Sequence, residues 1–156
     1  MKWSDSLGEP VYVHRKRMLG IDYGTRRIGL ALSDPLGIIA TPLETIANDN
    51  AAVERIAAIV DRERTTTVVV GMPFNLKGEK AKKAVEVETF VALLGKHVRA
   101  EIILWDERFT STIAQQTLRT MGAKKKDRQK KSTIDSMAAA IILQSFLSST
   151  KHSQVC

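Results

Sequence analysis

Apolar residues alternate or cluster along the chain in a pattern that predicts five strands. Residues 18–23 form the first apolar run and residues 28–33 the second, with a tight turn between them. Residues 37–41 are the expected third strand, and strands joined this closely must be antiparallel. The runs at 65–71 and 101–105 are continuous rather than alternating, which is typical of strands covered on both faces.

Four other segments carry apolar residues at helical spacings of three and four. They cover residues 53–60, 79–97, 109–121 and 132–147. Helical crossovers place the last two strands parallel to the first. The sequence therefore predicts an α/β protein with a mixed five-stranded sheet, its first three strands antiparallel and helices on both faces. This is the layout of the ribonuclease H-like fold.

These elements predict one domain over residues 17–148, between a flexible N-terminal leader (1–16) and a flexible tail (149–156). The longest apolar run, residues 137–143, is far too short to span a bilayer, and the leader has no apolar signal core. The lone cysteine, Cys156, excludes a disulfide framework and a CxxC metal site. We therefore expect a cytoplasmic protein without a membrane partner.

Positive charge is in excess over the whole chain. The sequence has 24 Lys and Arg against 17 Asp and Glu, a formal net charge of +7, which favours nucleic acid as a partner. The candidate nucleic-acid contacts are Arg26, Arg27, Arg108, Lys124, Lys125, Lys126, Arg128, Lys130 and Lys131. The alternative interpretation of the basic segment 122–131 is a solvated loop.

Acidic residues stand where predicted elements end or begin. Asp22 closes the first strand, and Asp106 and Glu107 follow the fifth. Asp135 lies in the first turn of the last predicted helix. Because parallel strands end at the same edge of a sheet, we expect these carboxylates to converge there.

Clustered carboxylates repel one another unless a cation lies between them. Oxygen ligands of this kind suit Mg²⁺ or Mn²⁺. Two such ions about 4 Å apart can activate a water and stabilise the leaving oxygen of a phosphodiester. The acidic residues therefore predict a two-ion site for cleaving a nucleic acid.

Each carboxylate also has a structural interpretation. Asp22 fits a turn-capping residue, and Glu107 fits a surface charge near a helix start. Asp135 stands three residues after Ser132, the spacing of a capping box. The residues alone do not choose between Asp106 and Glu107 as the ligand.

Four motifs resemble those of the YqgF family, described as Holliday junction resolvases and as pre-16S rRNA processing nucleases. In chain order they read GIDYGTRRIGLALSD, VVVGMPFNLKG, WDERFTS and STIDSMAAAIILQSFL. The match runs from Leu19 to Leu147, and the family's fold is ribonuclease H-like. The resemblance implies that the catalytic metal ligands are Asp22, Glu107 and Asp135, which selects Glu107 over Asp106.

The same resemblance places the loop GMPFN at the rim of the site, with Asn75 as a nucleic-acid contact. It implies a metal-dependent endonuclease acting on structured RNA, processing the 5′ end of pre-16S rRNA, with ribosomal particles as further partners. Three alternatives remain: a resolvase of four-way DNA junctions, a phosphate-binding ATPase with an Asp-Gly-Thr hairpin, and a non-catalytic RNA-binding module. No uninterrupted apolar patch identifies a dimer surface, so the sequence leaves the oligomeric state open.

Overall fold

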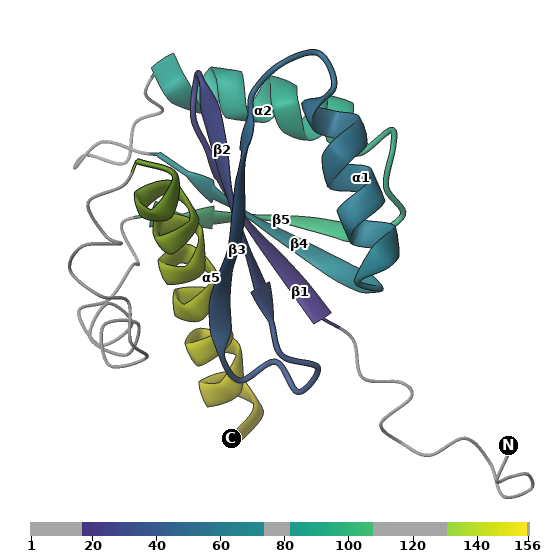
Figure 1. Cartoon of the computed structure of the whole chain (residues 1–156). Helices are drawn as coiled ribbons and strands as arrows, with labels where there is room; N and C mark the ends of the chain where they lie inside the picture. Colours follow the sequence, from purple (N-terminus) through teal and green to yellow (C-terminus); the bar gives the residue numbers. More distant parts are fainter. Residues whose placement is uncertain (1–16, 74–81, 108–130, 156) are drawn as a thin grey trace, which may run out of the picture.

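A five-stranded sheet lies at the centre of the computed structural model, which describes residues 17–73, 82–107 and 131–155 (Figure 1). The strands are β1 (Arg17–Tyr23), β2 (Arg27–Ser33), β3 (Ala40–Ala47), β4 (Thr65–Met72) and β5 (Glu101–Asp106). The helices within these ranges are α1 (Ala52–Arg62), α2 (Lys82–Leu94) and α5 (Lys131–Val155). The helix predicted at 109–121 and the leader at 1–16 lie outside the described residues.

The sheet is mixed, with the strand order β3-β2-β1-β4-β5. Strands β1, β2 and β3 pair antiparallel, whereas β4 is parallel to β1 and β5 is parallel to β4. This arrangement confirms the predicted sheet, with β1 central and one strand between it and β5. The C-terminal ends of β1, β4 and β5 therefore share one edge of the sheet. Because the sequence predicts the catalytic carboxylates there, we call it the catalytic edge.

Helices cover both faces of the sheet, as predicted (Figure 1). Leu19 and Ile21 of β1 pack into the core cluster beneath α1 and α2. Gly20 points to the other face, where a side chain would overlap Leu143 of α5. Since side chains alternate along a strand, Asp22 shares the α5 face with Gly20.

The third strand differs from the prediction of residues 37–41, because β3 begins only at Ala40. The Asp34 carboxylate accepts backbone hydrogen bonds from Leu36, Ile38 and Ile39, which holds 34–39 as a turn. Pro42 then lies inside β3, at a register shift opposite Ala31. Proline has no N–H to donate to a neighbouring strand. It is tolerated here because β3 is an edge strand and its pairing with β2 is already irregular at this position.

Strand β5 is less covered than its continuous apolar sequence predicts. Leu104 is 43% exposed, and no residue of β5 is fully buried. Among the described helices, α5 packs on β1 to β4 and α1 packs on β4, but none packs closely on β5, which is an edge strand. The expectation of burial on both faces was therefore wrong for this strand.

Helix α5 is longer than the predicted 132–147. It continues through residues 149–155, where a flexible tail was expected, and it contains neither Gly nor Pro to end it earlier. The buried Gln144 fixes the helix to the sheet: its Oε1 accepts from Ala40 N at 2.9 Å, and its Nε2 donates to Ile38 O at 3.0 Å. Among the described helices, none is long and apolar enough to cross a lipid bilayer.

A close approach between α5 and β2 depends on Gly29, where an added Cβ would overlap the backbone oxygen of Asp135. We expect Gly29→Ala to lower the free energy of unfolding by about 1–3 kcal/mol, because helix backbone cannot yield as a side chain can. Gly95→Ala is the matched control, since its Cβ would lie 3.3 Å from its nearest neighbour. Urea unfolding of both variants measures the difference, and equal stabilities would contradict the prediction.

Candidate active site

Asp22 and Glu107 meet at the catalytic edge. Asp22 is the penultimate residue of β1, and Glu107 directly follows β5. Between them lies Gly71 of β4, where a Cβ would come within 2.8 Å of Glu107 Oε1. Because Gly71 has no side chain, the Glu107 carboxylate can lie close against β4, the strand between β5 and β1.

The environment of Asp22 is unfavourable to its charge. Burial, followed by the negative charge of Glu107 and more weakly that of Asp135, raises the pKa of Asp22 from 3.8 to about 6, while Lys83 opposes the increase. A turn-capping carboxylate has no reason to share its surroundings with two other acids. These repulsions therefore favour the ligand interpretation of Asp22 over the turn-capping one.

The pKa of Glu107 is also above its ordinary value. Burial is the main cause, Lys83 opposes it, and the neighbouring charge of Asp106 adds to it. Among the charges that raise the pKa of Asp22, that of Glu107 has the largest effect. The geometry thus favours Glu107 as the partner of Asp22, in agreement with the choice implied by the family resemblance.

Asp135 reaches the same edge from α5 and forms an ion pair. Its Oδ2 accepts a hydrogen bond from Arg27 Nε at 2.7 Å, and the two side chains are 22% and 41% exposed. Asp135 lies beyond the first turn expected for it, because α5 already begins at Lys131. Ser132 is then inside the helix rather than at its N-cap, which argues against the capping-box interpretation.

Of the predicted nucleic-acid contacts, the structure describes the side chains of Arg26 and Arg27. Arg26 is exposed at the turn between β1 and β2, where a phosphate can reach it. Arg27, also predicted to hold phosphates, donates its Nε hydrogen to Asp135 and is 41% exposed, and its contact with phosphate stays a prediction. The described residues do not include Asn75, Arg108, Lys124, Lys125, Lys126, Arg128, Lys130 or the side chain of Lys131.

The donor set suits a hard divalent cation, since it consists of carboxylate oxygens whose charges repel without one. Asp22 and Glu107 are the pair that would hold such an ion. One oxygen of Asp135, which is predicted as the third ligand, is bonded to Arg27. In the described part of the chain, no group of three or more Asp, Glu, His or Cys side chains is arranged so that it could hold a metal ion.

Lys83 is a site residue that the sequence analysis missed. Its positive charge, on the first turn of α2, lowers the pKa of both Asp22 and Glu107. One signal in the sequence could have indicated it. Helix α2 begins soon after β4 ends, so its first turn returns at the catalytic edge.

Comparison with known proteins gives a family match over most of the chain. A family model described as "RuvX: Holliday junction resolvase" matches residues 16–149. A protein of Sulfurihydrogenibium sp. named "Putative pre-16S rRNA nuclease" is 44% identical, covering 84% of this chain and 89% of its own. A protein of Halalkalibacterium halodurans with the same name is also 44% identical, covering 84% of this chain and 95% of its own. These matches confirm the resemblance carried by the four motifs.

Two solved structures share the fold. The RuvC protein of T. thermophilus, in complex with a Holliday junction substrate, has a TM-score of 0.56 at 17% identity, covering 87% of this chain and 96% of its own. The fowlpox virus resolvase, in complex with Holliday junction DNA, has a TM-score of 0.51 at 11% identity, covering 86% of this chain and 98% of its own. At these identities the likeness shows the fold alone, and it confirms the predicted ribonuclease H-like architecture.

Proposed function

The chain belongs to the RuvX family, and from that premise we propose that it is a metal-dependent endonuclease that cleaves phosphodiester bonds in structured RNA. The observation that carries the proposal is the convergence of Asp22 and Glu107 at the catalytic edge, with Asp135 acting on the same site. The names of the two relatives support pre-16S rRNA as the substrate. Its 5′ end is the position of cleavage that we propose. Precursor ribosomal particles are then the natural partners, and the cytoplasm is the expected location.

The roles of the residues follow from their positions. Asp22 and Glu107 would hold the cation, with Mg²⁺ or Mn²⁺ as the ion and two ions as the expected number. Bound there, a divalent ion supplies a Lewis acid that activates water and stabilises the leaving oxygen of the phosphodiester. Arg27 orients the Asp135 carboxylate through its 2.7 Å hydrogen bond. Lys83 adds positive charge that attracts a phosphate to an otherwise acidic edge.

A four-way DNA junction is the second candidate substrate. The family description names a Holliday junction resolvase, and both solved neighbours are complexes with junction DNA. Carboxylate chemistry does not distinguish the two polymers, because it acts on the phosphate that both share. The substrate must therefore be determined by a direct comparison.

The test offers a precursor 16S rRNA 5′ fragment and a four-way DNA junction side by side, with Mg²⁺ or Mn²⁺. We expect the wild-type chain to cut the RNA, and Glu107→Gln to lower the single-turnover rate at least about a hundredfold. Asp106→Asn, one position away, is the matched control and should retain the rate within about fivefold. Cleavage of the junction alone would make the protein a DNA resolvase. A Glu107→Gln rate equal to that of the wild type would overturn the metal-site assignment.

A further inference from the structure

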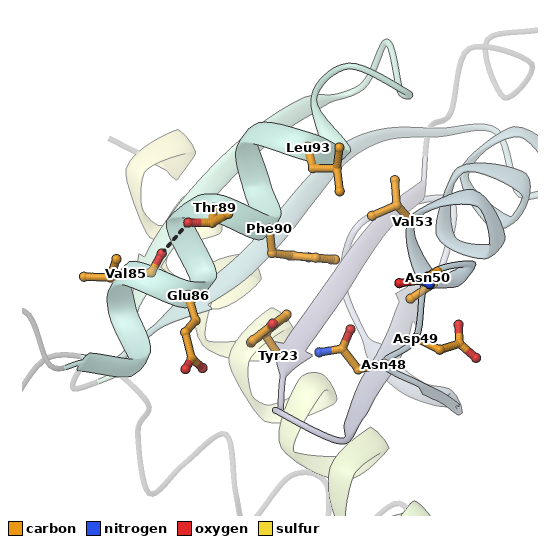
Figure 2. A pocket seen from close by; sticks show the side chains of 11 residues that line it. Tyr23, Asn48, Asp49, Asn50, Val53, Val85, Glu86, Thr89, Phe90 and Leu93 are labelled. Carbon is orange, nitrogen blue, oxygen red and sulfur yellow. Dashed lines mark hydrogen bonds between the residues drawn. The ribbon is translucent and has the colours of Figure 1, made fainter.

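A cleft of about 410 Å³ opens at the catalytic edge, on the face opposite the carboxylates. Its size falls within the range of about 300–1,000 Å³ that small-ligand sites occupy. The described residues that line it are Tyr23, Asn48, Asp49, Asn50, Ala52, Val53, Val85, Glu86, Thr89, Phe90 and Leu93. They come from the end of β1, the turn after β3, and the facing sides of α1 and α2 (Figure 2).

Two features give the cleft its chemical character. Tyr23 from β1 packs against Phe90 from α2, with ring centroids 4.9 Å apart, and Val53 of α1 faces them across the cleft (Figure 2). Phe90 is almost fully buried and braces Tyr23, whose ring remains partly exposed. Beside this apolar wall stand the side-chain amides of Asn48 and Asn50. Flat apolar rings next to amides suit a planar ligand with hydrogen-bonding edges.

The charges of the cleft exclude a phosphate as its occupant. Among the described lining residues there is no Lys or Arg, whereas Asp49 and Glu86 carry negative charge. Asp49 is neutralised from outside by Arg55, whose Nη2 lies 2.6 Å from Oδ2. Glu86 is exposed on α2. The cleft therefore favours an uncharged ligand that carries hydrogen-bond donors.

The cleft and the proposed active site lie on opposite faces of the sheet at the same end of β1. Tyr23 directly follows Asp22, so their Cα atoms are about 3.8 Å apart while their side chains point to opposite faces of the sheet. Asn48 is fixed to the same corner, because its Nδ2 donates to Gly24 O at 2.8 Å. A strand whose phosphate lies at Asp22 can thus turn a neighbouring nucleotide over the end of β1 and into the cleft.

We propose that this cleft binds an unpaired nucleobase of the RNA, next to the phosphate that is cleaved. The inference rests on the proposed function and extends it, since it adds a requirement for an unpaired nucleotide. The base stacks on Tyr23, and the amides of Asn48 and Asn50 contact its polar edge. Stacking on aromatic side chains is the usual way in which proteins hold unstacked RNA bases.

The test measures binding without cleavage, by fluorescence anisotropy in EDTA with the full chain. The probes are a single-stranded RNA of about a dozen nucleotides and the same RNA annealed to its complement. Tyr23→Leu should weaken binding of the single strand about tenfold and leave binding of the duplex within about twofold. Tyr23→Phe, which keeps the ring, should retain single-strand binding. Leu36→Ala alters an exposed apolar residue in the turn before β3 and should change neither.

A second measurement needs no variant, and so does not depend on the folding of Tyr23→Leu. In wild-type protein, the side-chain amide NMR signals of Asn48 and Asn50 should shift with the single strand. They should shift far less with an oligomer of the same length in which every base is replaced by an abasic residue.

The outcomes separate the two proposals. The nucleobase site would be overturned if Tyr23→Leu weakened binding of the single strand and of the duplex equally. It would also be overturned if the amide signals of Asn48 and Asn50 shifted as much with the abasic oligomer as with the single strand. Unchanged single-strand binding by a folded Tyr23→Leu protein would overturn it as well, while leaving the nuclease proposal in place. If wild-type protein bound neither RNA, the proposed function would fail and the cleft would fail with it.

Discussion

Asp22→Asn is expected to abolish cleavage and, in metal-free buffer, to raise the melting temperature. The loss of activity follows because Asn provides no negative oxygen for the cation. The gain in stability follows because the pKa of Asp22 is raised to about 6, mainly by burial and then by Glu107. At neutral pH the folded state must bear a charge that the unfolded chain carries at lower cost. The increase in the pKa of Asp22 from 3.8 to about 6 corresponds to a loss of at most about 3 kcal/mol in the free energy of unfolding.

The sign of the pH dependence follows from the direction of this shift. Well below pH 3.8 the Asp22 carboxyl is protonated in both states, and it has no effect on stability. As the pH rises towards 6, the unfolded chain releases the proton first, so the wild type loses stability relative to Asp22→Asn. Well above pH 6 both states are ionised, and the loss is complete and constant.

Thermal unfolding in EDTA near pH 4 and near pH 7.5, for both proteins, measures this effect. The variant should melt several degrees higher at the upper pH, and the difference should be much smaller at the lower. Adding Mn²⁺ should stabilise the wild type more than the variant. Cleavage by Asp22→Asn at a rate close to wild type, or a melting difference independent of pH, would contradict the assignment.

Asp135→Asn should also lower the cleavage rate by orders of magnitude, but with little change in stability. The substitution removes a negative oxygen at the catalytic edge and breaks the ion pair with Arg27. An ion pair that is partly exposed contributes only about 0–1 kcal/mol. A capping-box acid would show the opposite pattern, with normal cleavage and a measurable loss of stability.

Arg27→Gln distinguishes orientation of the third carboxylate from direct phosphate binding. If Arg27 positions Asp135, its loss should lower the rate at saturating RNA by about 10- to 100-fold, and Mn²⁺ affinity should fall. The affinity for RNA should hardly change. Arg26→Gln is the comparison variant, since that exposed neighbour is a predicted phosphate contact and its loss should lower RNA affinity rather than the saturated rate. Reduced RNA affinity with an unchanged saturated rate would instead identify Arg27 as a phosphate contact.

The strand order could be predicted because it rests on short connections and on periodicity. A turn between residues 23 and 28 leaves only an antiparallel pair, and helical crossovers leave only parallel ones. Those two rules also predicted that Asp22 and Glu107 would share an edge. The start of β3 was not predictable in this way, because the side chain of Asp34 holds several backbone N–H groups in a turn. Apolar Ile38 and Ile39 there look like strand residues.

The contacts of Asp135 could not be predicted, because they depend on how α5 lies on β2. That placement depends on the missing side chain of Gly29 and on the bonds of Gln144 to residues 38 and 40. Local sequence patterns carry no information about such a distant pairing. Lys83 was not predicted for a related reason. From sequence alone a lysine in a helix is assigned to the solvent-exposed surface, and only the position of α2 relative to the sheet brings it near Asp22 and Glu107.

The position of Asp135 on the last described element has a consequence for biosynthesis. A chain emerging from the ribosome presents Asp22 early and Glu107 after the fifth strand, but Asp135 arrives only with α5. That helix also covers a whole face of the sheet, so Ala31, Val69 and the rest of that apolar surface stay uncovered until it docks. Completion of the active site and burial of this aggregation-prone surface are therefore one late folding event. Incomplete chains that lack α5 also lack Asp135, and we expect them to be inactive as nucleases and, with their exposed sheet, to be substrates for chaperones or proteases.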